Sequence, residues 1–176
     1  MSKAYSLPGI RLGWIASRSY DVIDVALNHR SYTSISVGLL DQEVATYALD
    51  DKCIHNLLRR NIDMAKQNLA ILESFIERHR WACDWVRPVA STLSFVRFSK
   101  MGKPVDDAVF CRELLEKKGV LVVPGSSCFG NDTDYNGYVR IGYGNKEALE
   151  GALAAIAEFL DEDYESVPVV KQLALR

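Results

Sequence analysis

The chain has 176 residues, of which 48% are hydrophobic and 25% are charged, fractions typical of a globular protein. Its formal net charge is −2 at pH 7, with 21 basic and 23 acidic side chains mixed along the sequence. This balance gives no electrostatic footprint for nucleic acid or for an anionic membrane surface, so we expect neither as a partner.

Two further patterns narrow the class of protein. No apolar run approaches the ~20 residues that span a bilayer, and we expect no secretory signal peptide. The four cysteines, Cys53, Cys83, Cys111 and Cys128, are irregularly spaced and form no C-x-x-C pair. We therefore expect reduced thiols in a cytoplasmic protein, rather than disulfides or a metal site.

The first fifty residues combine strand, helix and break signals. After the Pro8-Gly9 turn, the segment Arg11–Ser17 (R-L-G-W-I-A-S) predicts a short buried strand. A short helix is expected over Arg18–Arg30. The Ser/Thr-rich stretch Ser31–Ser36 predicts a break, and one of its hydroxyls could cap a helix that begins near Val37.

A long amphipathic helix is predicted after the Asp50-Asp51 pair. Apolar residues recur at three- and four-residue steps from Ile54 to Ile76, and the opposite face is charged. Thirty helical residues would reach ~45 Å, longer than a small domain is wide. We therefore expect residues 51–80 to bridge two bodies, the first of which contains residues 1–50.

From Trp81 the composition changes to that of a small α/β domain, which we expect over residues 81–162. The turn and loop signals fall at Lys100–Pro104 and Ser126–Gly137. The strands are expected within Trp85–Phe98, Val120–Val123 and Tyr138–Tyr143, and the helices over Val105–Lys118, ended by Gly119, and after the capping residue Asn145. This order predicts a two-layer sheet with helices on one face. Residues 163–176 show no period and are left as a tail.

The stretch Ser2–Trp14 (S-K-A-Y-S-L-P-G-I-R-L-G-W) carries the most evident chemistry. Lys3 can form an imine with a carbonyl cofactor, and Arg11 can hold a phosphate through two parallel hydrogen bonds. The two residues lie eight positions apart with a turn between them, so both could face one small molecule. Taken alone, Lys3 is more typical of a solvated terminal lysine, and Arg11 could form an ion pair at the start of a buried strand.

This stretch resembles the Schiff-base lysine segment of class I/II aminotransferases, which are pyridoxal-phosphate enzymes of fold type I. Two later motifs agree with the resemblance and occur in the expected order: V-L-V-V-P-G-S-S-C-F-G at Val120–Gly130 and Y-V-R-I-G-Y-G at Tyr138–Gly144. The resemblance implies an α/β fold that comprises the last strand and helices of the large domain, a long interdomain helix and the small C-terminal domain.

The resemblance also implies roles for individual residues. Lys3 would bind pyridoxal 5'-phosphate covalently and later move the substrate proton, while Arg11 would hold the cofactor phosphate and Ser2 could add a hydroxyl contact. Arg140 would hold the α-carboxylate of the substrate, although a strand arginine by default faces solvent. The implied reaction transfers an amino group between an amino acid and a 2-oxo acid, in a homodimer of the full-length enzyme.

Other interpretations stay open at this point. Fold-type I lyases, decarboxylases and cyclising enzymes share the same motifs, and a small α/β domain with a long helix could instead be a non-catalytic dimerisation module. In the family, the Gly-rich phosphate loop and the Asp that protonates the pyridine nitrogen lie upstream of the lysine. We therefore expect this chain to be a C-terminal fragment that is inactive alone.

Overall fold

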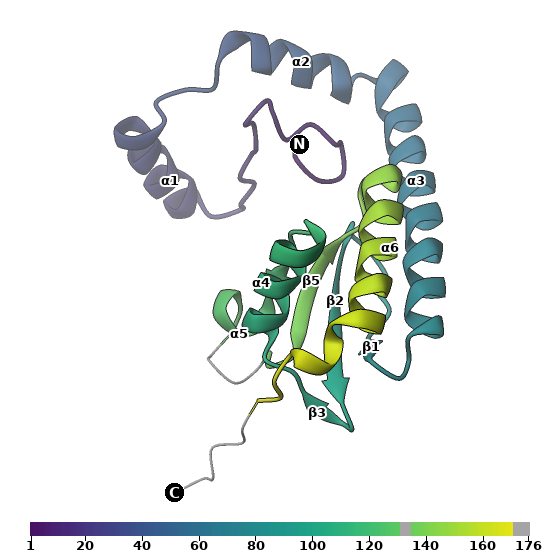
Figure 1. Ribbon diagram of the computed structural model, residues 1–176. Coiled ribbons are helices and arrows are strands. Elements are labelled where there is room, and N and C mark those ends of the chain that lie inside the picture. The colour runs from purple at the N-terminus through teal and green to yellow at the C-terminus, as the bar shows by residue number, and fades with distance from the viewer. Residues whose placement is uncertain (131–134, 171–176) are drawn as a thin grey trace, which may run out of the picture. The chain divides into compact units, whose positions relative to one another are not determined.

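The computed structural model describes residues 1–130 and 135–170, and the chain divides into two compact units, Met1–Asp63 and Met64–Arg176. Helix α3 (Asp51–Arg78) runs through this boundary, so its first half belongs to one unit and its second half to the other (Figure 1). No helix in the described part of the chain is both long and apolar enough to cross a membrane.

The first unit contains helices α1 (Tyr20–Thr33) and α2 (Leu39–Leu49) and the start of α3, and it buries little apolar surface. The strand expected over Arg11–Ser17 is wrong: this segment pairs with no strand in residues 1–130 and 135–170, and all of its residues except Leu12 are exposed. A strand needs a neighbour to satisfy its backbone groups, and no other part of residues 1–63 forms one.

The break expected over Ser31–Ser36 is also partly wrong, because α1 continues to Thr33. The hydroxyls of Ser31 and Thr33 donate to carbonyl oxygens four residues earlier, at Leu27 (3.0 Å) and His29 (2.9 Å), as hydroxyls often do inside helices. The residue that precedes α2 is Gly38, and no side chain caps that helix. These hydroxyls therefore lie within α1 and do not start the next helix.

The predicted long helix is confirmed as α3, which has 28 residues. Within the second unit its inward face buries Leu72, Phe75 and Ile76 completely or almost so. Asn68 is also buried, and its amide donates to the carbonyl oxygen of Tyr143 at 2.9 Å, just beyond strand β5. The helix is thereby fixed to the small domain by a polar contact as well as by its apolar stripe.

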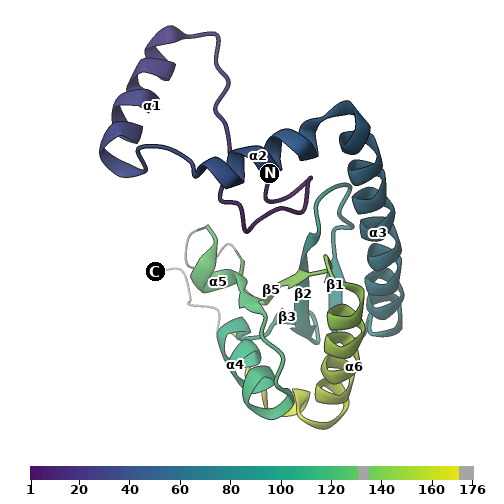
Figure 2. The same ribbon diagram turned by 90° about the horizontal axis from the view of Figure 1, so that it is seen from above.

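The second unit is built on an antiparallel sheet in the order β1-β2-β5-β4, with β3 paired to the far end of β2. Helices α4 and α6 lie together over one face of this sheet (Figures 1 and 2). The strands are β1 (Cys83–Trp85), β2 (Leu93–Lys100), β3 (Lys103–Pro104), β4 (Val123–Pro124) and β5 (Tyr138–Gly142), and the helices are α4 (Asp107–Lys118), the short α5 (Gly125–Cys128) and α6 (Lys146–Glu162). The predicted α/β class with helices on one face of a sheet is confirmed.

The helix ends expected in this unit form as predicted. Asn145 accepts a hydrogen bond from the Ala148 N–H at 3.0 Å and so caps α6, while Gly119 ends α4 in the left-handed region. Alternate residues of β2 and β5 face the helices, and the core forms between these two layers. Phe110 lies at its centre, stacked on Phe98 at 4.4 Å and edge-on to Phe159 at 5.4 Å.

Residues 163–170, which show no pattern in the sequence, pack onto the small domain. Tyr164 and Val167 are buried, and the Tyr164 hydroxyl donates to the Ser99 carbonyl oxygen at 3.0 Å. The backbone N–H of Asp106 donates to the Pro168 carbonyl oxygen at 2.8 Å, which holds the segment beside the start of α4. The remainder of the expected tail, residues 171–176, lies outside the described residues, as do residues 131–134 of the expected loop.

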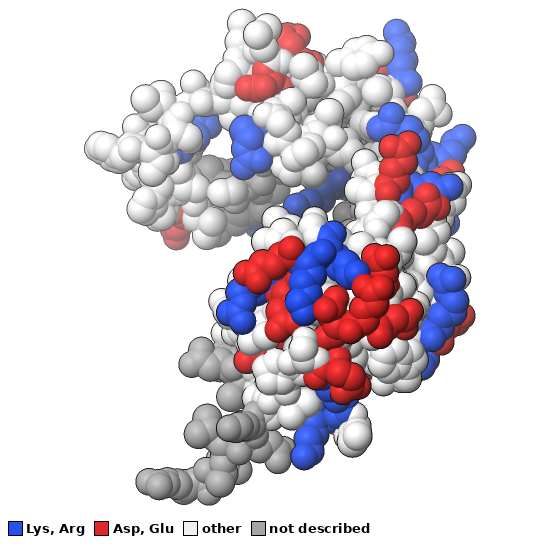
Figure 3. Space-filling model, in the orientation of Figure 1, with Lys and Arg blue, Asp and Glu red and all other residues white. Residues whose placement is uncertain are grey.

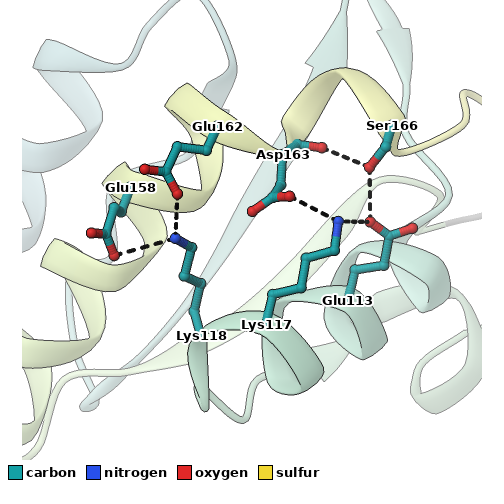
Figure 4. Close-up of polar contacts among 7 residues, drawn as sticks. All are labelled: Glu113, Lys117, Lys118, Glu158, Glu162, Asp163 and Ser166. Atoms are coloured by element: carbon teal, nitrogen blue, oxygen red, sulfur yellow. Dashed lines mark hydrogen bonds and ion pairs between the residues drawn. The ribbon is translucent and has the colours of Figure 1, made fainter.

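Two clusters of polar contacts join α4 to α6 and to the segment after it (Figure 4). One consists of Lys118, Glu158 and Glu162, and the other of Lys117, Glu113, Asp163 and Ser166. Lys118 Nζ lies 2.6 Å from Glu162 Oε2 and 3.3 Å from Glu158 Oε2, and Lys117 Nζ lies 2.9 Å from Asp163 Oδ1. Hydrogen bonds to these carboxylates raise the pKa of both lysines. Figure 3 shows the resulting alternation of basic and acidic side chains on this surface.

Candidate active site

The segment that carries Lys3 and Arg11 forms a folded loop in the first unit. The Ser6 N–H donates to the Lys3 carbonyl oxygen at 3.0 Å. The Arg11 guanidinium donates from Nη1 to the Pro8 carbonyl oxygen at 2.9 Å. Asn61 on α3 is buried, and its amide donates to the Ala4 carbonyl oxygen at 2.9 Å. This last contact fixes the loop to the long helix directly beside Lys3.

Lys3 and Arg11 are exposed on this loop, and Ser2 is half-buried. Arg11 has a φ of 45°, so it does not continue as extended backbone. Arg11 therefore does not begin a buried strand, and its exposed guanidinium needs no ion-pair partner. The guanidinium keeps further N–H donors beyond the one used at Pro8, and an amine and a guanidinium that both face solvent suit an aldehyde that carries a phosphate.

Arg140 lies in the second unit, in the middle of β5, and points to the side of the sheet opposite the helices. Its neighbours in the strand, Val139 and Ile141, are buried in the core, whereas Arg140 is half-buried. The guanidinium carbon lies 5.4 Å from the centroid of the Phe129 ring, a cation–π distance. The expected default of a solvated strand arginine is therefore not what the structure shows.

Aromatic side chains gather around Phe95, beside Arg140, on this face of the sheet. Phe95 lies directly across from Arg140 on β2 and contacts Phe129 edge-on at 4.9 Å, Tyr135 at 5.7 Å and Tyr138 at 6.4 Å. A guanidinium framed by rings can hold a carboxylate by paired hydrogen bonds while the rings contact apolar atoms of the same ligand.

A second arginine, Arg97, lies on the same face two residues beyond Phe95. Across the described residues, its Nε is the one buried side-chain nitrogen or oxygen that has no hydrogen-bond partner. Sequence reasoning missed both Arg97 and the rings. The alternation of side chains along β2 could have indicated Phe95 and Arg97, because both occupy positions of the strand that face away from the core.

Three other titratable side chains of the second unit, Cys83, Cys111 and His79, pack in ways that indicate a structural role. Burial raises the pKa of the Cys83 and Cys111 thiols to about 12, so both stay protonated at neutral pH. His79 Nδ1 lies 2.8 Å from the Phe75 carbonyl oxygen, and its ring packs on the Phe75 ring. Within residues 1–130 and 135–170, no group of three or more His, Cys, Asp or Glu side chains could hold a metal ion.

The sequence and the structure of the chain were compared with those of known proteins. Residues 1–156 match the family described as aminotransferase class I and II. The capreomycidine synthase of Streptomyces vinaceus is 32% identical over 161 residues, which are 91% of this chain and 39% of the synthase. The crystal structure of a PLP-dependent aminotransferase from Streptococcus suis superposes with a TM-score of 0.77 at 37% identity, covering 91% of this chain and 40% of that one.

A PLP-dependent cyclase, OrfR, also superposes with a TM-score of 0.77, at 26% identity, over 92% of this chain and 41% of the cyclase. The chain thus spans about 40% of the length of the proteins that it matches. The family and these neighbours imply pyridoxal phosphate (PLP) as the cofactor. With a match that extends over most of its length, this chain belongs to the class I and II aminotransferase family.

Proposed function

We propose that this chain supplies the cofactor lysine and a substrate-binding arginine to an enzyme that transfers an amino group between an amino acid and a 2-oxo acid. The observation that carries the proposal is the setting of Arg140, a half-buried guanidinium against the Phe129 ring on the open face of the sheet. The family resemblance implies that the arginine of the Tyr138–Gly144 motif binds the α-carboxylate of the substrate.

The first unit would provide the cofactor contacts in this proposal. When bound, pyridoxal phosphate supplies an electron sink for negative charge that develops on the substrate Cα. The Lys3 amine is the group that would hold the cofactor covalently and then carry a proton away from the substrate Cα. Arg11 would pair with the phosphate, and the Ser2 hydroxyl could add one further hydrogen bond.

Arg140 would orient the amino acid. Two parallel N–H donors fix both oxygens of a carboxylate and so limit rotation of the substrate about its Cα. The Phe129 ring restrains the plane of the guanidinium, which a lysine ammonium at this position would not reproduce. A homodimer and a cytoplasmic location of the complete enzyme belong to the same proposal.

A second candidate is a PLP-dependent reaction that closes a ring in place of amino transfer. It is favoured by the similarity to a capreomycidine synthase and to the cyclase OrfR, since both cover nine-tenths of this chain or more. A third interpretation is that the chain is a non-catalytic dimerisation module. Such a module would keep its function without Lys3 or Arg140, whereas the enzyme needs both.

The test is product analysis with the natural protein in which this chain occurs. It is incubated with pyridoxal phosphate, a panel of L-amino acids and 2-oxoglutarate, and the products are identified by mass spectrometry. Amino transfer gives glutamate and a new 2-oxo acid, whereas ring closure gives a cyclic product without glutamate. We expect Lys3→Ala to abolish product formation and Arg140→Lys to lower kcat/KM by about tenfold or more. Unchanged activity in both variants would refute the proposal.

A further inference from the structure

A buried carboxylate, that of Asp107, holds both ends of the connection between β4 and β5. Asp107 is the first residue of α4 and is only 1% exposed. Its Oδ2 accepts hydrogen bonds from the Ser126 N–H (2.9 Å) and the Ser126 hydroxyl (2.8 Å), and its Oδ1 accepts one from the Gly137 N–H (3.0 Å). Three donors satisfy this buried carboxylate, so its contacts hold Ser126 and Gly137 in place.

The backbone at both ends of this connection is closely packed. A Cβ on Gly125 would lie 2.8 Å from the Tyr138 carbonyl oxygen, and a Cβ on Gly137 would lie 2.8 Å from the Phe98 carbonyl oxygen. Neither position therefore has room for a side chain. Asp107 lies 19 and 30 residues away from its two partners in sequence, so this anchor depends on the tertiary fold.

The connection carries the ring that contacts Arg140. Phe129 follows Ser126 closely in sequence, packs on Phe95 at 4.9 Å and lies under the Arg140 guanidinium at 5.4 Å. Since Ser126 is bound to Asp107 through both its backbone and its hydroxyl, the position of the ring depends on that carboxylate.

We propose that Asp107 is a positioning residue for Arg140, acting through Ser126 and Phe129 to fix the plane in which the guanidinium meets a carboxylate. The inference rests on the proposed function only in taking Arg140 as the carboxylate anchor. Without Asp107, Phe129 leaves the guanidinium and Arg140 adopts several orientations, so a carboxylate ligand is held less well.

Asp106 provides a matched control for a purely structural role. Its carboxylate accepts a hydrogen bond from the Val109 N–H at 3.0 Å and caps the same helix, and among the described residues it makes no hydrogen bond to Ser126 or Gly137. Removing this cap destabilises α4 without removing a contact to Ser126 or Gly137. A role of Asp107 in stability alone predicts the same behaviour for variants at both positions.

The test is NMR of the 176-residue chain. We expect the ring current of Phe129 to displace the chemical shift of the Arg140 Nε–H, and the Phe129→Leu variant identifies this displacement. We expect Asp107→Asn to remove this displacement and to speed hydrogen exchange at Ser126 and Gly137 by at least about tenfold. Asp106→Ala retains the displacement. Retention of the displacement in folded Asp107→Asn, or its loss in both variants, would overturn the proposal.

Two additional measurements keep the outcome interpretable. If Asp107→Asn does not fold, Ser126→Ala removes only the hydroxyl contact, and we expect a partial loss of the displacement; no change would count against the proposal. Titration of the unmodified chain with sodium acetate tests Arg140 itself. An Nε–H signal that does not respond to acetate contradicts Arg140 as the carboxylate anchor, while the ring-current result still decides whether Asp107 positions it.

Discussion

Replacing Gly137 by alanine is expected to destabilise the small domain considerably more than the same change at Gly119. Both glycines have positive φ, 79° and 69° respectively, so an alanine at either position costs about 1–2 kcal/mol for the left-handed backbone. At Gly119 nothing lies within 4 Å of the new Cβ, whereas at Gly137 it would meet the Phe98 carbonyl oxygen and Pro104 Cβ, both at 2.8 Å. Overpacking of that kind adds about 1–3 kcal/mol.

Urea unfolding measures this difference directly. Trp81 packs edge-on against Tyr164 at 5.9 Å, so its fluorescence reports the second unit, and a Trp14→Phe background removes the signal of the first. We expect the free energy of unfolding to fall by about 2–5 kcal/mol for Gly137→Ala and by about 1–2 kcal/mol for Gly119→Ala. Equal losses in the two variants would show that the close contacts at Gly137 are not rigid, and would refute the reasoning.

Three other outcomes follow from the packing and charges of the same domain. Phe110→Ala should cost about 3–5 kcal/mol in urea unfolding, and Phe110→Leu clearly less, because Phe110 is fully buried against the rings of Phe98, Phe159 and Tyr164. Above about pH 9 the free energy of unfolding should fall, because unfolded thiols ionise while Cys83 and Cys111 stay protonated up to a pKa of about 12. A Cys83→Ala, Cys111→Ala double variant should lose part of that slope, and an unchanged slope would contradict the assignment. Lys118→Met should lower the urea midpoint at low salt and less so in 1 M NaCl, since its ion pairs are at the surface; a loss independent of salt would point to packing instead.

The elements that the sequence predicted well are those whose signals are local. The apolar stripe of α3 is a strong 3.6-residue period, and the ends of α4 and α6 follow from Gly119 and Asn145, whose conformations or side chains act on their own helix. The strand expected over Arg11–Ser17 did not form, because its pattern says nothing of whether a partner strand exists. Residues 163–170 were missed since the burial of Tyr164 depends on distant contacts.

The candidate site divides in the same way. The types of Lys3, Arg11 and Arg140 and their motifs were visible in the sequence, but the cation–π contact of Arg140 was not, because Phe129 comes from another element. Nothing in the sequence singles out Asp107, which follows Asp106 at the start of α4. Only the fold brings Ser126 and Gly137 to its carboxylate, and no local pattern indicates that contact.

Whether Lys3 is the residue that holds pyridoxal phosphate is tested most directly by borohydride reduction and peptide mapping. The protein is incubated with pyridoxal phosphate, reduced, digested and analysed by mass spectrometry, with Arg11→Ala in parallel. The account predicts that the label is concentrated on the Lys3 peptide and that Arg11→Ala reduces this preference, because the guanidinium no longer pairs with the phosphate. A label spread evenly over the exposed lysines, or one that the loss of Arg11 does not affect, would contradict it.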